Sequence, residues 1–198
     1  IGVLAAARPD RLIVVGPAEQ SGRGPHPQGT TGSFAGFGVD LAVQLGSGEA
    51  KDGELPASLA VAAWLLERAQ WAGHVEGLGV GEPLAPERCL EVGSELAVRA
   101  ERVALLVMGD GSACRTLKAP GYLDERAEPF DAEAARALGS ADLPALRALD
   151  AELAYELKAA GRAPWQVLAG AAEGAGLSGT LLYDEAPYGV GYLVAAWS

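Results

Sequence analysis

Residues that bind metals or form disulfides are scarce in this chain of 198 residues. It contains two cysteines, Cys89 and Cys114, and two histidines, His26 and His74. No C-x-x-C or H-x-x-x-H pair occurs, which excludes a zinc site of the usual local spacing. Two cysteines also cannot form the dense disulfide framework of a small secreted domain. We expect Cys89, in an amphipathic stretch, to be a small buried hydrophobic residue.

Long apolar runs are missing as well. The longest strong run, Val103–Met108, has six residues, whereas a bilayer-spanning helix needs roughly 20. No secretory signal is visible at the start of the sequence, and we therefore expect a cytoplasmic protein without a membrane partner. Since 49% of the residues are apolar, the chain can still bury the core of a full domain.

Basic residues are too few for a nucleic-acid-binding protein. The chain has 15 lysines and arginines against 26 acidic residues, a formal net charge of −11. Proteins that bind nucleic acid derive much of their affinity from basic residues that neutralise phosphates. No basic stripe occurs here, so nucleic acid and anionic membrane surfaces are poor partners, and the acidity favours solubility.

Short apolar runs alternate with segments of helical periodicity. We expect strands at Arg11–Gly16, Val39–Leu45, His74–Val80, Arg102–Met108, Thr180–Tyr183 and Tyr188–Trp197, and helices at Pro56–Ala72, Pro86–Ala100, Asp131–Leu138, Leu143–Ala160 and Trp165–Ala175. This alternation predicts an α/β fold over residues 1–198, a single-domain three-layer sandwich with helices on both faces of a mixed central sheet. The last two strands are close enough in sequence for an antiparallel hairpin at an edge.

Capping residues and polar segments set the expected boundaries. Asp131 is the expected N-cap of its helix, and Asp142 caps the next one with Pro144 in the first turn. Two long loops are expected, Pro17–Ser33 and 109–126, and loops of this length are usually functional or mobile. The adjacent Asp184 and Glu185 fit a charged turn better than an acid/base pair, since neighbours on an extended chain face opposite ways.

A glycine-rich turn, MGDGSACR at residues 108–115, directly follows the apolar run Val103–Met108. Ligands of α/β proteins bind beyond the carboxyl ends of the strands, so this turn is a candidate ligand site; it is equally consistent with a plain turn in which Asp110 bonds local backbone. Ser112 and Cys114 are poor nucleophile candidates, because the G-x-S-x-G pattern is absent and no base is placed nearby. His26, between two prolines, is either a ligand or an exposed loop residue.

Several of these segments together resemble the catalytic B-type chain of the class III extradiol ring-cleaving dioxygenases, a superfamily that includes DOPA dioxygenase-like and Memo-like proteins. The sequence looks most similar to an alanine-rich actinobacterial branch of it. Residues 9–19 (PDRLIVVGPAE) resemble the family's second strand, and residues 109–117 (GDGSACRTL) resemble its G-D-L-S-H-R-L motif. Further likeness runs through Gly32–Asp40, Pro129–Asp150, Gly161–Gly170 and Pro187–Tyr192.

The resemblance implies a reaction that inserts O₂ beside a catechol diol, at Fe(II) held by two histidines and a glutamate. Such a triad leaves coordination positions open for the diol and O₂. The implied pocket residues are Glu19, His26, Asp110, Ser112, Arg115 and Tyr188. The resemblance also allows a homodimer and a small aromatic ligand, and it implies a further N-terminal strand, carrying one metal histidine, ahead of Ile1.

The expected chemical residues of the family are replaced at two positions. The metal-histidine position at the end of the second strand holds Ala18, and the acid/base histidine position holds Ala113, or Cys114 after a shift of one residue. Alanine has neither a lone pair nor a transferable proton. Two hypotheses follow. One is a dioxygenase with a rearranged iron site that uses His26, Asp110 or Cys114. The other is a cofactor-free, non-catalytic ligand- or protein-binding relative.

Overall fold

The computed structural model describes all residues, Ile1–Ser198, and the chain forms two compact units. The first unit contains Ile1–Gly81 and Glu95–Met108, and the second contains Glu82–Ser94 and Gly109–Ser198. The chain passes between them three times: after Gly81, within helix α3 (Pro86–Ala97) and after Met108. Whether residues 1–198 act as one domain stays a prediction.

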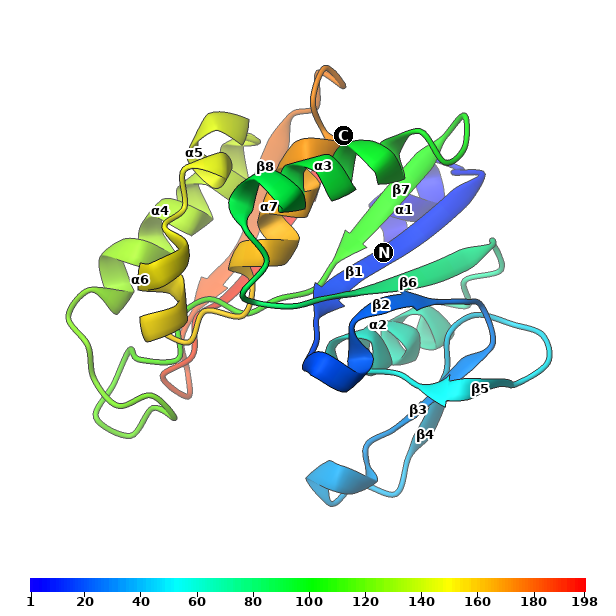
Figure 1. Ribbon diagram of the computed structural model, residues 1–198, viewed down its shortest axis with the longest axis horizontal. Helices are drawn as coiled ribbons and strands as arrows, with labels where there is room; N and C mark the ends of the chain where they lie inside the picture. Colours follow the sequence, from blue (N-terminus) through cyan, green and yellow to red (C-terminus); the bar gives the residue numbers. More distant parts are fainter. The chain divides into compact units, whose positions relative to one another are not determined.

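The first unit is built on a mixed four-stranded sheet in the order β2-β6-β1-β7 (Figure 1). Strand β1 (Arg11–Pro17) pairs in parallel with β6 (Val75–Val80) and β7 (Val103–Val107), and the short β2 (Gly24–His26) pairs antiparallel with β6. The predicted α/β class and the predicted mixed sheet are confirmed.

Strand β1 lies at the centre of the first unit's core. Its alternate residues Leu12 and Val14 pack with helix α2 (Ala57–Arg68), and Leu4 of α1 (Gly2–Ala6) lies against the same cluster. The other buried members of this cluster are Val43, Leu45, Leu55, Leu59, Ala60, Ala62, Ala63, Leu66 and Val75. Ile13 and Val15, which point to the opposite face, are equally buried. Burial on both faces explains the unbroken β-branched run, as is usual for a parallel strand.

The predicted loop Pro17–Ser33 contains more regular structure than expected. It includes the 3-10 turn η1 (Gln20–Gly22), β2, and β3 (Thr30–Ser33). Strand β3 pairs antiparallel with β4 (Ala42–Gln44) and in parallel with β5 (Lys51–Glu54), which makes a second small sheet. Strand β4 is a shorter form of the strand predicted at Val39–Leu45. Strands β2, β3 and β5 were missed because each has only three or four residues, too few for a visible alternation. The turn η2 (Ala35–Phe37) connects β3 to β4.

The second unit combines short helices with a separate hairpin. Strands β8 (Gly179–Glu185) and β9 (Tyr192–Trp197) pair antiparallel, which confirms the predicted hairpin. Its predicted place at a sheet edge is wrong, because the two strands form a sheet of their own. Helix α4 (Ala127–Ser140) packs against β8. Asp184 and Glu185 belong to β8 and pair with β9, so the prediction that they form a turn is wrong. The turn starts one residue later, at Ala186.

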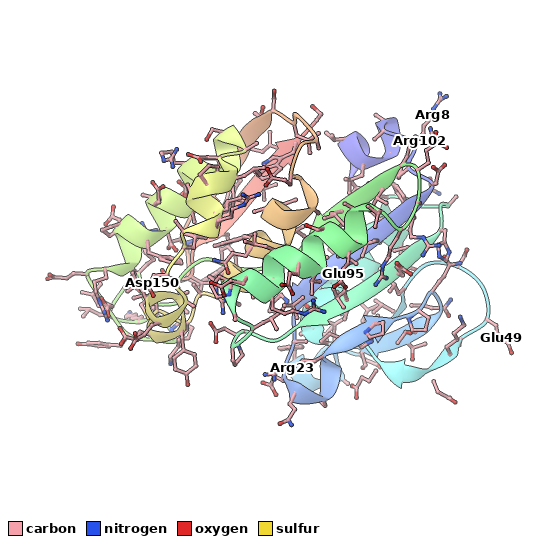
Figure 2. All side chains as sticks on the ribbon, turned by 45° about the horizontal axis from the view of Figure 1, so that its top comes forward. Arg8, Arg23, Glu49, Glu95, Arg102 and Asp150 are labelled. Atoms are coloured by element: carbon pink, nitrogen blue, oxygen red, sulfur yellow. The ribbon has the colours of Figure 1, made fainter.

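The predicted helix Leu143–Ala160 is two helices, α5 (Leu143–Arg147) and α6 (Ala151–Glu156). Asp142 caps α5 as predicted, but Asp150 caps α6, because its Oδ1 accepts from the backbone N–H groups of Glu152 and Leu153 at 2.8 and 3.0 Å. Figure 2 shows Asp150 at the start of α6. An aspartate side chain competes with the helical hydrogen bonds in this way. The leucine periodicity continues through the break and hid it.

Helices α3 and α7 (Arg162–Ala171) approach closely through two glycines of the second unit. A β-carbon on Gly93 would overlap the carbonyl oxygen of Val167, and one on Gly170 would overlap the carbonyl oxygen of Leu90. The atoms that would be struck are backbone, so they cannot rotate away. The glycines therefore set how near the two helices lie.

Because of this contact, a glycine-to-alanine substitution in α7 should destabilise the protein instead of stabilising it. Gly→Ala inside an exposed helix usually adds up to about 1 kcal/mol to stability. We expect Gly170→Ala to lower the free energy of unfolding instead, by roughly 1–3 kcal/mol, as overpacking does. Urea unfolding measures the difference. Gly36→Ala, at a position with no atom within 4 Å of the new carbon, is the control and should change little. Stabilisation by Gly170→Ala would contradict the close contact.

None of the helices combines the length and apolar character that crossing a bilayer requires.

Candidate functional site

The glycine-rich turn after β7 opens the second unit, and the chain from it to α4 contains no helix or strand, as predicted. It is nevertheless held in place by hydrogen bonds along its length. The N–H of Gly161 donates to the carbonyl of Asp110 at 2.8 Å, and the N–H of Arg115 donates to the carbonyl of Gly189 at 3.0 Å. These hydrogen bonds hold the turn in one conformation.

The buried carboxylate of Asp131 organises this turn. Its Oδ1 accepts from the backbone N–H of Ser112 at 2.7 Å, and its Oδ2 accepts from the Ser112 hydroxyl at 2.8 Å. Arg115 adds an ion pair to Oδ2 at 3.2 Å. Asp131 is 1% exposed and Ser112 is fully buried. Three donors satisfy the charge that burial would otherwise penalise.

Two of the expected pocket residues, Ser112 and Arg115, are thus brought together. They meet around Asp131, which the sequence analysis expected to be a helix cap. The prediction that Asp131 caps a helix is wrong, because α4 starts at Ala127 and Asp131 lies in its second turn. A signal was present: Asp131 shares a helical face with Ala134, Ala135 and Leu138. A charged residue on an apolar face indicates a buried, paired group. Ser112 has no surface for a substrate to reach.

Glycines allow Asp131 to come this close to the backbone. Gly111 and Gly191 bridge two segments, with the N–H of Gly111 donating to Gly191 at 2.7 Å and the N–H of Gly191 donating to Ser112 at 2.8 Å. A β-carbon on Gly111 would lie 2.7 Å from Oδ1 of Asp131, and one on Gly191 would lie 2.5 Å from Oδ2. The carboxylate fills the space that two side chains would have occupied.

Asp110, Tyr188 and Tyr192 supply the reactive and aromatic groups beside this framework. Although Asp110 reaches the surface, the protein around its carboxyl removes enough water to raise its pKa. Burial raises the pKa of the Tyr192 phenol, and the charges of Asp110 and Tyr188 raise it further. Backbone hydrogen bonds from Gly111 to Gly191 and from Arg115 to Gly189 hold the two segments that carry these side chains together. Tyr188 is 77% exposed and can offer its ring face to a ligand.

Ala113 and Cys114 hold the turn in place through hydrogen bonds and offer no reactive group at the surface. The N–H of Ala113 and the thiol of Cys114 both donate to the carbonyl of Leu157, at 2.9 and 3.4 Å. Cys114 is buried, and burial raises the pKa of its thiol. A buried thiol with a raised pKa holds little thiolate, the form that attacks carbon or binds a metal.

The remaining candidates, Ala18, Glu19 and His26, belong to the first unit. Glu19 is exposed at the start of η1, and Ala18 is half-buried just after β1. His26 lies in β2, opposite Gly77 of β6, and its Nε2 lies 2.8 Å from the carbonyl oxygen of Gly22. Because a carbonyl can only accept, Nε2 carries a proton and donates this hydrogen bond. The loop position predicted for His26 is wrong: it is a strand residue, and it is half-buried.

The donors of this chain do not fit the Fe(II) that the family resemblance implies. No group of three or more His, Cys, Asp or Glu side chains is arranged to hold a metal ion. The two family positions hold methyl groups, at Ala18 and Ala113, and the thiol of Cys114 is already engaged with Leu157. The second unit therefore contains an ordered turn with carboxyl and phenol groups, and no facial triad.

No family model matches the sequence, and no curated protein matches it. Among solved structures the chain is similar to an uncharacterized protein, JW3007, from Escherichia coli K12. The similarity has a TM-score of 0.56 at 15% sequence identity, and it covers 99% of this chain and 90% of that chain. This structural similarity supports the α/β fold, and at so low an identity it carries no information on activity.

Proposed function

We propose that this chain is a non-catalytic relative of the extradiol dioxygenases that binds a small aromatic hydroxy compound at the turn after β7. The observation that carries the proposal is the donor set: methyl groups at Ala18 and Ala113, and no cluster of metal-binding side chains elsewhere. A methyl group neither coordinates iron nor transfers a proton. The turn itself is held in one conformation by Asp131, so its shape is kept although the two histidine positions hold alanine.

The chain's own residues suggest how such a ligand is held. The exposed ring of Tyr188 offers a stacking face, and the carboxyl of Asp110 offers acceptors to a ligand hydroxyl. The removal of water around Asp110 strengthens such a hydrogen bond. Arg115 is committed to Asp131 and keeps the turn in position. The aromatic ligand, the homodimer and the cytoplasmic location stay predictions.

Catechol, tested with and without added Fe(II), separates the two hypotheses. We expect binding in isothermal titration calorimetry, and no oxygen uptake in either condition. Asp110→Asn should weaken catechol binding by about 10-fold, the effect of losing a hydrogen bond to a charged group. Asp184→Asn, at an exposed carboxylate of β8, is the matched control and should bind normally.

Two results would contradict the proposal. Oxygen uptake that depends on Fe(II) and catechol would restore the dioxygenase hypothesis, with a rearranged set of ligands. Calorimetry that detects no catechol binding would remove the ligand site itself.

A further inference from the structure

The turn that joins β3 to β4 presents large apolar side chains to solvent. Phe37 is 70% exposed, Val39 is 51% exposed and Leu41 is 37% exposed. These side chains belong to residues 34–41, a segment called the tip below. Figure 1 shows the tip at the end of the β3–β4 hairpin, where it projects from the rest of the first unit. Large apolar side chains gathered on a surface indicate a contact with another molecule.

The tip is held in one conformation by its own backbone. The N–H of Phe34 donates to the carbonyl of Leu41 at 2.9 Å, and the N–H of Val39 donates to the carbonyl of Phe34 at 3.2 Å. Gly38 has the left-handed conformation that the turn requires, with a φ of 76°. The ring of Phe34 packs against the core of the first unit and lies 6.5 Å from the ring of Phe37. A surface that is already ordered loses little conformational entropy when it docks.

A groove of the first unit lies directly beside the tip. It runs between β4 and the last turns of α2, and its volume is about 490 Å³. Its lining includes the apolar Val43 and Leu66 and the exposed, charged Glu67. An apolar centre with polar groups around it is typical of protein interfaces. Ala42 also lines the groove and follows Leu41 of the tip in sequence, so tip and groove are neighbouring parts of one surface.

We propose that this chain forms a two-fold homodimer in which the tip of each copy, led by Phe37, occupies the groove of the other copy. In a two-fold dimer the same surface of both molecules meets, and each contact is therefore made twice. Because tip and groove are adjacent on one hairpin, a single axis between them serves both contacts. A second copy covers both parts at once, and the dimer does not depend on the ligand proposed at the turn after β7.

The area of the tip agrees with a weak dimer. An aromatic side chain buries about 150–250 Å² when it is fully covered, so Phe37, Val39 and Leu41 together expose on the order of 300 Å². The groove loses a similar area when it is covered, and the symmetry doubles both. The pair therefore buries about 1,200 Å², the lower end of the range for specific interfaces. We expect a dissociation constant on the order of 10 μM.

Sedimentation velocity over a range of protein concentrations measures the dimer. Salt is added because it screens the repulsion between copies that each carry a net charge of −11. We expect Phe37→Ser to weaken dimerisation by about 100-fold, since each dimer loses two apolar anchors. Val98→Ser is the matched control, because Val98 belongs to the same unit and is 81% exposed but lies outside the hairpin.

The control should dimerise as the unchanged chain does. A chain that stays monomeric at about 1 mM, roughly 100 times the expected dissociation constant, would overturn the proposal. Normal dimerisation of Phe37→Ser would overturn it as well, because the tip would then lie outside the interface.

A mixing experiment tests whether the tip of one copy enters the groove of the other. Ala42→Arg adds a long charged side chain to the groove at an exposed position and leaves the tip intact. Each variant alone loses both contacts of its dimer. A mixture of Phe37→Ser and Ala42→Arg still allows one contact, between the intact tip of one variant and the intact groove of the other. We expect more dimer in the mixture than in either variant alone, and no recovery on mixing would contradict the arrangement.

Discussion

We expect Asp131→Ala to lower the free energy of unfolding of the second unit by about 3–5 kcal/mol, the range found when one partner of a buried ion pair is removed. The substitution leaves the hydroxyl and backbone N–H of Ser112 without an acceptor and the half-buried Arg115 without its closest charge. It also opens a gap between Gly111 and Gly191, which carry no side chains to fill it. Urea unfolding followed by the fluorescence of Trp165 and Trp197, both in the second unit, measures the loss.

Glu128→Ala is the matched control, because Glu128 contacts the same arginine from the surface. Its Oε1 lies 3.9 Å from Nη2 of Arg115, and its side chain is 79% exposed against 1% for Asp131. An exposed ion pair contributes roughly 0–1 kcal/mol, so this variant should unfold almost as the parent does. Equal small losses for both variants would mean that Asp131 is not the centre of the turn.

Arg162→Met should lower the free energy of unfolding by a similar amount, about 3–5 kcal/mol, because Arg162 is a buried cation with two backbone acceptors. It is 1% exposed, and its guanidinium donates to the carbonyls of Glu82 and Leu84, to Gln166, and to the Glu82 carboxylate at 3.1 Å. Methionine fills much of the volume but satisfies none of these acceptors. The segment before α3 would lose its attachment to α7.

Two further variants test whether geometry or charge matters at this position. Arg162→Lys keeps the charge but loses the planar fork that reaches separate acceptors at once, so it should recover only part of the lost stability. Arg88→Met removes a surface arginine of α3, paired with Glu91 at 3.0 Å, and should cost well under 1 kcal/mol. If Arg162→Met unfolded like Arg88→Met, the buried network would be unimportant.

Elements with a strong local pattern were predicted well. Strands β1 and β6 were expected within one residue of their observed bounds, and helix α2 was expected within one residue of its start but four residues too long at its end. The hairpin β8–β9 was expected from the closeness of its strands. A buried β-branched run and an amphipathic stripe are each visible within a single segment. Failures fell where the pattern was too short, as in β3 and β5, or continued across a break, as at Asp150.

The candidate site was predicted less well, for a reason that Asp131 illustrates. The sequence singled out the turn at residues 109–115, and the structure contains an ordered turn there. It did not identify the partner, because Asp131 lies 19 positions after Ser112 and its role depends on how α4 packs. Arg162 and Glu82, separated by 80 positions, were missed for the same reason.

The sequence by itself determined the α/β class, the acidic surface and the missing chemical groups, because composition, periodicity and the identity of a side chain are local properties. Only the tertiary structure decided that the buried carboxylate of Asp131 has three donors, and that the indole N–H of Trp71 is buried without an acceptor. A polar group gains or loses its hydrogen-bond partners through neighbours that are distant in sequence. Its environment, and hence its chemistry, is fixed when those neighbours pack together.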